Sequence, residues 1–303
     1  MHLLLSAALL FGQATTPANS YLQTVTEPNG VFSLKTAARR LHAEGKPDVW
    51  LVGVAHVGLK SYYASIQKLL DAQSQVLYEG VKQSPNPAEP PTANKDAKPA
   101  GPAPKPVYQV FSDALGLDFQ LVDINYNHPN WVDSDLTMEE LDALNKGGAG
   151  GKPNTFDTLK NLLDPSSPMA AQFARILAAM TPGTKEGLKL FMVKRLSALD
   201  PFAVIGDPTT TNVVLTARNK SAERFFDKAI NKPEHPASVA IFYGALHQPD
   251  LEADLAKQYG YKVVETRWFK AATADTKKVD AQGQTVYNLL DAQLSPKAPK
   301  QKP

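Results

Sequence analysis

Two histidines of this chain follow apolar segments in the same way. In the segment LVGVAHVG, Gly53 lies three positions before His56. Much later in the chain, in FYGALHQP, Gly244 lies three positions before His247. Both apolar runs are typical of β-strands that are covered on both faces. A histidine just past a strand end, present twice, is therefore the first candidate for chemistry.

A carboxylate is expected beside these histidines. Each Gly-x-x-His motif is followed by a predicted helix and a strand that ends in an acid, Glu79 in VLYEGV and Glu265 in VVETRW. Ligands of parallel sheets gather outside the carboxyl ends of the strands, above all where the direction of the connections reverses. His56, Glu79 and His247 are predicted to converge there. Glu265 is left out, because the nearby Arg267 makes it an ordinary surface ion pair.

Two imidazoles and one carboxylate are a common way to hold a divalent metal ion with positions left for water or substrate. We expect His56, Glu79 and His247 to bind manganese, cobalt or zinc. Glu79 then either completes the coordination or accepts a proton from a water that the metal activates. The alternative for each histidine is a hydrogen-bonded structural residue. The glycines are expected to supply backbone torsions that let the chain leave the strand sharply.

Composition excludes several other kinds of chemistry. The 303 residues contain no cysteine, which excludes disulfides, thiolate zinc sites and a cysteine nucleophile. The formal net charge is +2, without a basic stripe interleaved with aromatic residues, so nucleic acid is not an expected partner. The motifs of serine hydrolases, phosphate loops and His-Glu-x-x-His zinc proteases are absent from the sequence.

The predicted elements give an α/β fold with a mostly parallel sheet, built from two β-α-β units that carry the Gly-x-x-His motifs. In the first unit, the strands that begin at Asp48 and Gln75 flank a helix and are expected to be parallel neighbours. The segment DFQLVDI, from Asp118, is predicted as a third strand. ASVAIFYG and YKVVETRWF flank the helix of the second unit. A large helical insertion over residues 136–231 separates the units.

The ends of the chain and one long loop are expected to lie outside this core. Residues 1–14 resemble a signal peptide, with a buried N-terminal helix as the alternative. We expect one domain over 20–293, a disordered Pro-rich loop over 83–106 and a disordered tail over 294–303. The mature protein is then exported to the periplasm or secreted, soluble, and without an integral membrane segment after cleavage. Its oligomeric state is left open.

Four segments together, GVAH, YEG, TARNKSAERFFDKAI and YGALHQPDLEADLAKQYGYKVVET, resemble the TraB/PrgY/GumN family, which includes the TIKI-like metalloproteases. The resemblance covers residues 48–81 and 212–268. It implies a metal-dependent hydrolase, on a fold shared with EreA-like erythromycin esterases and ChaN-like proteins. It also implies that His56, Glu79 and His247 form the centre of the site.

In the same resemblance, Arg218 and Asn219 line the cleft and contact the substrate. Arg218 would stabilise an oxyanion or hold a substrate carboxylate, with a surface ion pair as the alternative. The chain departs from the family at Ala217 and at Gln248-Pro249, which leaves the substrate class open. Asp135 could supply a further carboxylate, although a turn role explains it equally well.

The leading hypothesis is a metal-dependent hydrolase, with a peptidase as one form of it, that acts on a peptide or small-molecule substrate. The competing hypothesis is a non-catalytic exported protein that binds a peptide, a haem-like ligand or an iron complex with the same polar groups. A structural protein with a degenerate site is a third possibility. The enzyme and the binding protein need the same polar cleft, whereas the structural protein would bind neither metal nor ligand.

Overall fold

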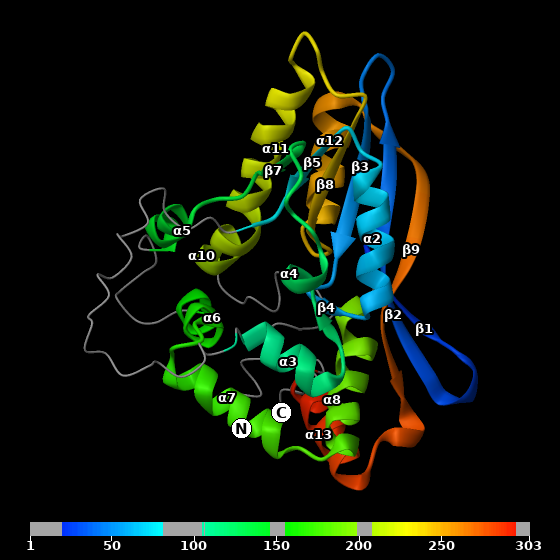
Figure 1. The fold of residues 1–303 in the computed structure, drawn as a ribbon, viewed down its shortest axis with the longest axis vertical. Helices are drawn as coiled ribbons and strands as arrows, with labels where there is room; N and C mark the ends of the chain where they lie inside the picture. Colours follow the sequence, from blue (N-terminus) through cyan, green and yellow to red (C-terminus); the bar gives the residue numbers. More distant parts are fainter. Residues whose placement is uncertain (1–19, 81–104, 106, 146–154, 199–207, 295–303) are drawn as a thin grey trace, which may run out of the picture.

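The computed structural model describes residues 20–80, 105, 107–145, 155–198 and 208–294 (Figure 1). Several expectations fall outside these ranges: the signal peptide over 1–14, the Pro-rich loop over 83–106 apart from Lys105, and the disordered tail over 294–303 apart from Leu294, which ends a helix. The two Gly-x-x-His segments lie within the described residues.

A seven-stranded sheet forms the centre of the described fold, in the order β1-β2-β3-β8-β5-β7 with β9 also paired to β2. The strands are β1 (Leu22–Thr26), β2 (Val31–His42), β3 (Asp48–Val54), β5 (Gln75–Tyr78), β7 (Trp131–Asp133), β8 (Ser238–Gly244) and β9 (Lys262–Asp275). β3, β8, β5 and β7 pair in parallel, whereas β1, β3 and β9 each pair antiparallel with β2. All described strands of this sheet except β2 therefore run in one direction. The predicted α/β fold with a mostly parallel sheet is confirmed.

The two predicted β-α-β units run through α2 (Lys60–Asp71) and α12 (Gln248–Tyr259). Their strands are parallel, but the expectation that the strands of the first unit are neighbours is wrong. β8 inserts between β3 and β5, and β2 and β3 separate β8 from β9. The chain thus leaves β3 towards one edge of the sheet and β8 towards the other edge. β3 and β8 lie side by side, and the connections that follow them run in opposite directions across the sheet. Ligand sites form at such points in parallel sheets.

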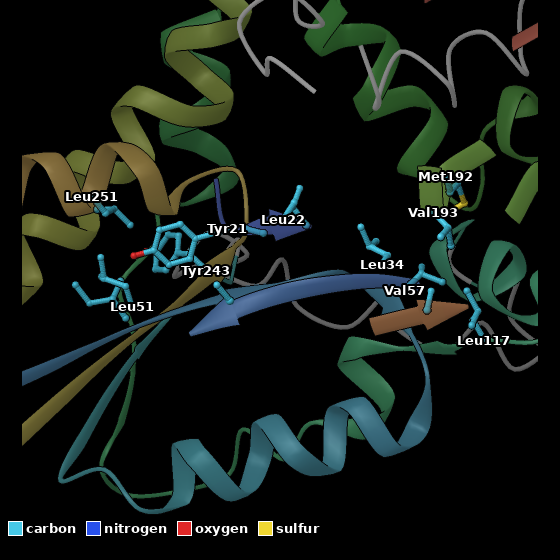
Figure 2. Close-up of a cluster of buried hydrophobic side chains, with 14 of the residues drawn as sticks. Tyr21, Leu22, Leu34, Leu51, Val57, Leu117, Met192, Val193, Tyr243 and Leu251 are labelled. Carbon is cyan, nitrogen blue, oxygen red and sulfur yellow. The ribbon is translucent and has the colours of Figure 1, made fainter. Parts of the chain in front are cut away.

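Helices cover the two faces of the sheet separately. α2 buries Tyr62 and Ile66 in a cluster with Trp50, Val52 and Phe242 on one face. On the opposite face Leu51, Tyr243 and Leu251 belong to the larger cluster (Figure 2). Because β3 and β8 contribute to both clusters, each of these strands must be apolar at nearly every position.

The helical region between β7 and β8 has the predicted segments. Its helices are α5 (Met138–Asn145), α6 (Thr155–Leu163), α7 (Pro168–Ala179), α8 (Pro182–Arg195), α10 (Pro208–Thr211) and α11 (Ala217–Ile230). The side chain of Thr137 accepts a hydrogen bond from the Glu140 N–H, and Glu140 accepts one from the Thr137 N–H, so α5 begins with a reciprocal capping box. The predicted helix over 212–230 is π-helical over Asn212–Thr216 and α-helical from Ala217.

The third strand predicted from Asp118 is wrong for most of its length. Only β6 (Asp118–Phe119) is a strand, and it pairs antiparallel with β4 (Val57–Gly58) outside the main sheet. The next residues form the short helix α4 (Gln120–Asp123), where Leu121 and Val122 are 62% and 64% exposed. The apolar run is therefore not buried between layers as a sheet strand is. The third parallel strand is β7.

Two further elements have no counterpart in the sequence-based prediction. One is the long strand β2, which joins β1 and β9 to the parallel strands. The other is the C-terminal helix α13 (Ala281–Leu294), which crosses α8 where Gly187 and Gly283 approach closely. The sequence predicts a helix from Tyr108 to Leu115, and α3 (Val107–Leu115) confirms it. No helix in the described residues is both long enough and apolar enough to span a bilayer.

Leu51→Ala should lower the free energy of unfolding by about 2–5 kcal/mol, because the side chain of Leu51 on β3 is fully buried in the larger hydrophobic cluster. Urea unfolding followed by circular dichroism measures the change. Leu289→Ala is the matched control, since Leu289 is 43% exposed on α13 and its truncation should cost less than about 0.5 kcal/mol. Equal losses in both variants would contradict the assignment of Leu51 to the core.

Candidate functional site

The register of the parallel strands places three strand ends together. Val54 at the end of β3 lies opposite Gly244 at the end of β8, and Tyr78 at the end of β5 lies opposite Phe242. The N–H of the next residue, Glu79, continues the ladder by donating to the Phe242 carbonyl at 2.9 Å. The segments that carry His56, Glu79 and His247 therefore leave the same edge of the sheet.

The three predicted side chains meet above Gly244. A Cβ atom placed on Gly244 would lie 3.3 Å from Glu79 Oε2, 3.4 Å from His56 Nε2 and 3.5 Å from His247 Cδ2. His247 Nε2 lies 3.7 Å from Glu79 Oε1. His247 is 4% exposed, whereas His56 is partly exposed. Three residues far apart in sequence are thus gathered at one point, with access to solvent on the His56 side.

Each imidazole is held through its Nδ1 by a side-chain amide. His56 Nδ1 lies 2.8 Å from Gln120 Oε1, and His247 Nδ1 lies 2.7 Å from Asn219 Oδ1. An amide oxygen only accepts hydrogen bonds, so each Nδ1 is the donor. The Nε2 atom of each neutral ring then has a free lone pair. Histidines that bind metals commonly have their other ring nitrogen fixed in this way.

Gln120 reaches His56 because of a short local ladder. β4 begins one residue after His56 and pairs with β6, which ends one residue before Gln120. The Gln120 N–H donates to the His56 carbonyl at 3.0 Å, and its side-chain Nε2 donates to Tyr126 Oη at 2.7 Å. Gln120 is 3% exposed. The β4–β6 pairing therefore fixes His56 through both the main chain and the side chain of Gln120.

Arg218 lies between two carboxylates. Its NH2 group donates to Glu79 Oε1 at 2.7 Å, and its Nε donates to Asp135 Oδ1 at 2.9 Å. The guanidinium also donates to Asp135 Oδ2, which makes the Asp135 contact bidentate. The side chain of Arg218 is 12% exposed and that of Asp135 is fully buried. The surface ion pair considered for Arg218 is therefore wrong, and Asp135 has more than a turn role.

The charges of this cluster control each other. Burial alone would raise the pKa of Glu79, but Arg218, His247 and His56 hold this pKa well below its usual range. Burial lowers the pKa of His247 to about 4. Burial would likewise lower the pKa of Arg218, but Glu79 and Asp135 raise it above its usual value. At neutral pH, Glu79 and Arg218 are charged and His247 is neutral.

Gly53 and Gly244 are required by close approach and not by backbone torsion. Neither has a positive φ, so the expected role in turning the chain is wrong. A Cβ on Gly53 would lie 3.2 Å from Ala245 Cα and from the Ala37 carbonyl oxygen. At Gly244 the missing side chain leaves room for the three site residues, and the Gly244 N–H donates to Glu79 Oε2.

The arrangement includes groups that sequence reasoning did not assign. Gln120 fixes His56, Asp135 binds Arg218, and the ring of Tyr108 lies 5.8 Å from that of His56. Burial raises the pKa of Tyr108 to about 12, with a further contribution from Glu79. Asp135 was considered as a further carboxylate, but its position after a strand was not recognised because β7 was not predicted.

Other candidates lie apart from this cluster. Glu265 pairs with Arg40 and Arg267, as expected for a surface ion pair. His128 stacks on Trp131 and lies 3.7 Å from Asp71. Neither Glu265 nor His128 contacts the cluster of His56, Glu79 and His247.

The donor set suits a divalent cation, although no group of three His, Asp or Glu side chains in the described residues has the spacing of a completed metal site. The space that a Cβ on Gly244 would fill adjoins His56 Nε2, Glu79 Oε2 and His247 Cδ2, and the Nε2 atom of His247 lies 3.7 Å from the other carboxylate oxygen of Glu79. Each oxygen of Glu79 accepts one hydrogen bond and keeps a second lone pair. With neutral imidazoles, the two carboxylates of Glu79 and Asp135 outweigh the single positive charge of Arg218, so the cluster is net negative.

Comparisons of the chain with protein-family models, with curated proteins and with solved structures find no match. The class of this protein is therefore described from its fold and its site alone. The chain is an α/β protein with a His-Glu-His cluster at the carboxyl edge of its parallel strands, backed by a buried Asp-Arg pair.

Metal-free protein should lose stability as the pH falls below 6.5, the usual value for histidine, towards the lowered pKa of His247 at about 4. In this window the unfolded chain binds a proton that folded His247 does not, so the loss should reach up to about 3 kcal/mol. The contribution of Glu79, whose pKa is also lowered, is lost only below its usual 4.5. Glu223, whose pKa burial raises to about 7, acts in the opposite direction over the same window. The contribution of His247 is therefore the difference between the wild type and a His247 variant in urea unfolding between pH 7 and 4.5.

The His247→Gln variant should lack this part of the pH dependence, whereas His42→Gln should keep it. His42 is a suitable control because its side chain is 56% exposed and pairs with Asp48. Identical pH profiles for the wild type and His247→Gln would show that burial does not lower the pKa of His247.

Gly244→Ala should disable the site and leave the fold intact. The new methyl group would lie in ordinary contact with His56 and His247 and slightly too close to Glu79, so the Glu79 carboxylate must shift by a few tenths of an ångström and the space between the three side chains is filled. We expect a change in unfolding free energy of no more than about 1 kcal/mol. Metal affinity, measured by calorimetric titration with manganese, cobalt or zinc, should fall by about tenfold or more. Unchanged affinity would place any metal elsewhere.

Proposed function

We propose that the chain is a metal-dependent hydrolase of the TraB/PrgY/GumN type that acts on a peptide or small-molecule substrate. The observation that carries the proposal is the gathering of His56, Glu79 and His247 at Gly244, with the Nδ1 atom of each imidazole bound by an amide oxygen and the Nε2 atom of His247 3.7 Å from the Glu79 carboxylate. The resemblance of the two Gly-x-x-His segments to that family supports the same function. Export through residues 1–14 is part of the proposal.

His56, Glu79 and His247 would hold the divalent ion. The ion supplies a Lewis acid, which lowers the pKa of water from about 15.7 towards 7. Glu79 suits the role of ligand better than that of general base, because a carboxylate with a strongly lowered pKa is a weak proton acceptor. Neutral His247 can bind a cation at neutral pH without first losing a proton.

Arg218 and Asp135 would set the charge of the site. Arg218 alone would neutralise Glu79, but Asp135 binds the same guanidinium and restores a net negative charge. Arg218 also keeps Glu79 from turning away, because both carboxylate oxygens have donors, one from Arg218 and one from the Gly244 N–H. This role differs from direct capture of a substrate carboxylate, for which the guanidinium has few donors left.

The charge balance favours a cation over an anionic ligand. A haem-like or carboxylate ligand would need a free cationic group, whereas Arg218 is occupied by Glu79 and Asp135. Burying a further negative charge beside a net negative cluster is costly. The binding-protein alternative therefore fits best when its ligand brings a metal ion.

Removal of a proposed ligand should abolish metal binding. His56→Ala and Glu79→Gln should each weaken binding of manganese, cobalt or zinc by about 100-fold or more and abolish hydrolysis in a screen of peptides and esters. Elemental analysis of the purified protein, followed by titration calorimetry, measures the first effect. Circular dichroism verifies that each variant is folded.

His42→Ala and Glu44→Gln serve as matched controls, because both residues are exposed at the end of β2 and beyond it. Both should keep wild-type affinity and turnover. Metal binding that is equally strong in Glu79→Gln and Glu44→Gln would refute the site. Metal-dependent ligand retention without turnover in the wild type would favour the binding protein over the enzyme.

A further inference from the structure

Within the described residues, the outer edge of β9 is unpaired over its first nine residues, whereas further on the Ala271 carbonyl accepts a hydrogen bond from the Leu59 N–H at 2.7 Å. β9 pairs with β2 along its length, and no other strand in the described part of the chain pairs with β9 (Figure 1). Its first nine residues, 262–270, are exposed or only partly buried on both faces of the sheet. Such an edge presents unpaired N–H and C=O groups that readily pair with another strand.

This edge also exposes apolar side chains. Val263 is 41% exposed, Val264 is 51% exposed and Trp268 is 39% exposed. Between them lie Glu265 and Arg267, which pair with each other on one face at 2.6 Å. The guanidinium of Arg267 also lies 4.6 Å from the ring centroid of Trp50. The charged pair is therefore held in place by its own chain.

The sequence of this edge is complementary to itself. Two copies of β9 related by a two-fold axis must pair antiparallel. The two residue numbers of each opposed pair then have the same sum throughout the pairing. When the axis passes through Thr266, Glu265 lies opposite Arg267 of the second copy, and Thr266 lies opposite Thr266. Val264 then lies opposite Trp268. Opposite charges, paired threonines and aromatic with β-branched residues are the combinations that stabilise cross-strand neighbours.

The neighbouring registers lack this match. An axis through Glu265 places two carboxylates opposite each other, and an axis through Arg267 places two guanidinium groups opposite each other. The β2–β9 ladder is regular from Glu265 to Lys270, with irregularities beyond both ends. Lys262 and Lys270 would be opposed at the margins, which restricts pairing to the central residues.

We propose that the chain forms a two-fold symmetric dimer through antiparallel pairing of the β9 edges, centred on Thr266. This surface is separate from the His-Glu-His cluster, so the dimer does not depend on the proposed hydrolase activity. The two sheets join into one continuous sheet. The partner is a second copy of this chain.

A single engineered thiol tests both the dimer and its register. The chain contains no cysteine, so Thr266→Cys introduces one thiol per chain. Directly opposed residues of antiparallel strands have Cα atoms about 4.5–5.5 Å apart, within the range for a disulfide. Mild oxidation should convert most of the full-length Thr266→Cys protein into a covalent dimer on a non-reducing gel.

Val264→Cys is the matched control. It carries an exposed thiol on the same strand, but its opposite position is Trp268, so it should cross-link far more slowly. Equal cross-linking rates for the two variants would overturn the proposed register. Failure of Thr266→Cys to cross-link would overturn it as well.

Sedimentation of the untagged wild type should show a dimer that dissociates on dilution. Arg267→Glu should raise its dissociation constant by about tenfold or more, because the introduced carboxylate would lie opposite Glu265 of the second copy. Circular dichroism verifies that the variant remains folded. A wild type that sediments as a monomer at every concentration would overturn the proposal, as would a dimer that Arg267→Glu leaves unchanged.

Discussion

The buried carboxylate of Glu79 is the constraint on which the rest of the site depends. An ionised carboxylate taken out of water needs compensation, since burial penalises the charged form. Arg218 and the Gly244 N–H supply it directly. Arg218 in turn is buried, which explains why Asp135 must lie beside it. The polar groups at the carboxyl edge form one connected charged unit, and removal of a single member leaves another unpaired.

The topology of the sheet determines which residues can join this unit. β8 lies between β3 and β5, so all three strand ends lie within reach of Gly244. The position of β8 between β3 and β5 is therefore what makes the site possible. If β3 and β5 were direct neighbours, β8 would lie to one side of them and His247 would be farther from either His56 or Glu79. α11 begins after a π-helical segment and brings Arg218 and Asn219 in its first turn over the same edge. Such irregular helical segments are frequent at functional sites.

The sequence was sufficient to predict those parts of the fold that depend on local pattern. β3 and β8 are buried on both faces, so their continuous apolar runs show in the sequence, as does the periodicity of α2 and α12. β7 has only three residues, too few to show a period. Without β7, the sequence could not decide between a site role and a turn role for Asp135, because that choice depends on the strand that precedes it.

Contacts made by tertiary structure were not accessible in the same way. The role of Gln120 depends on the β4–β6 ladder, which has two residue pairs and no sequence signature. The glycines were identified at the right positions for the wrong reason, since close packing and not φ requires them. A single sequence shows that a position is glycine but not which neighbour would collide with a side chain.

The direction of the strands relates the proposed dimer to the site. β9 runs parallel in direction to β3, β8 and β5, although β2 separates it from them. In an antiparallel β9 pair, the strands of the second copy run the opposite way, so its carboxyl edge faces the opposite end of the joined sheet. The two His-Glu-His clusters would then lie at opposite ends, each open on its own. Dimer formation would extend the sheet and bury the exposed apolar edge without placing a residue of either copy in the site of the other.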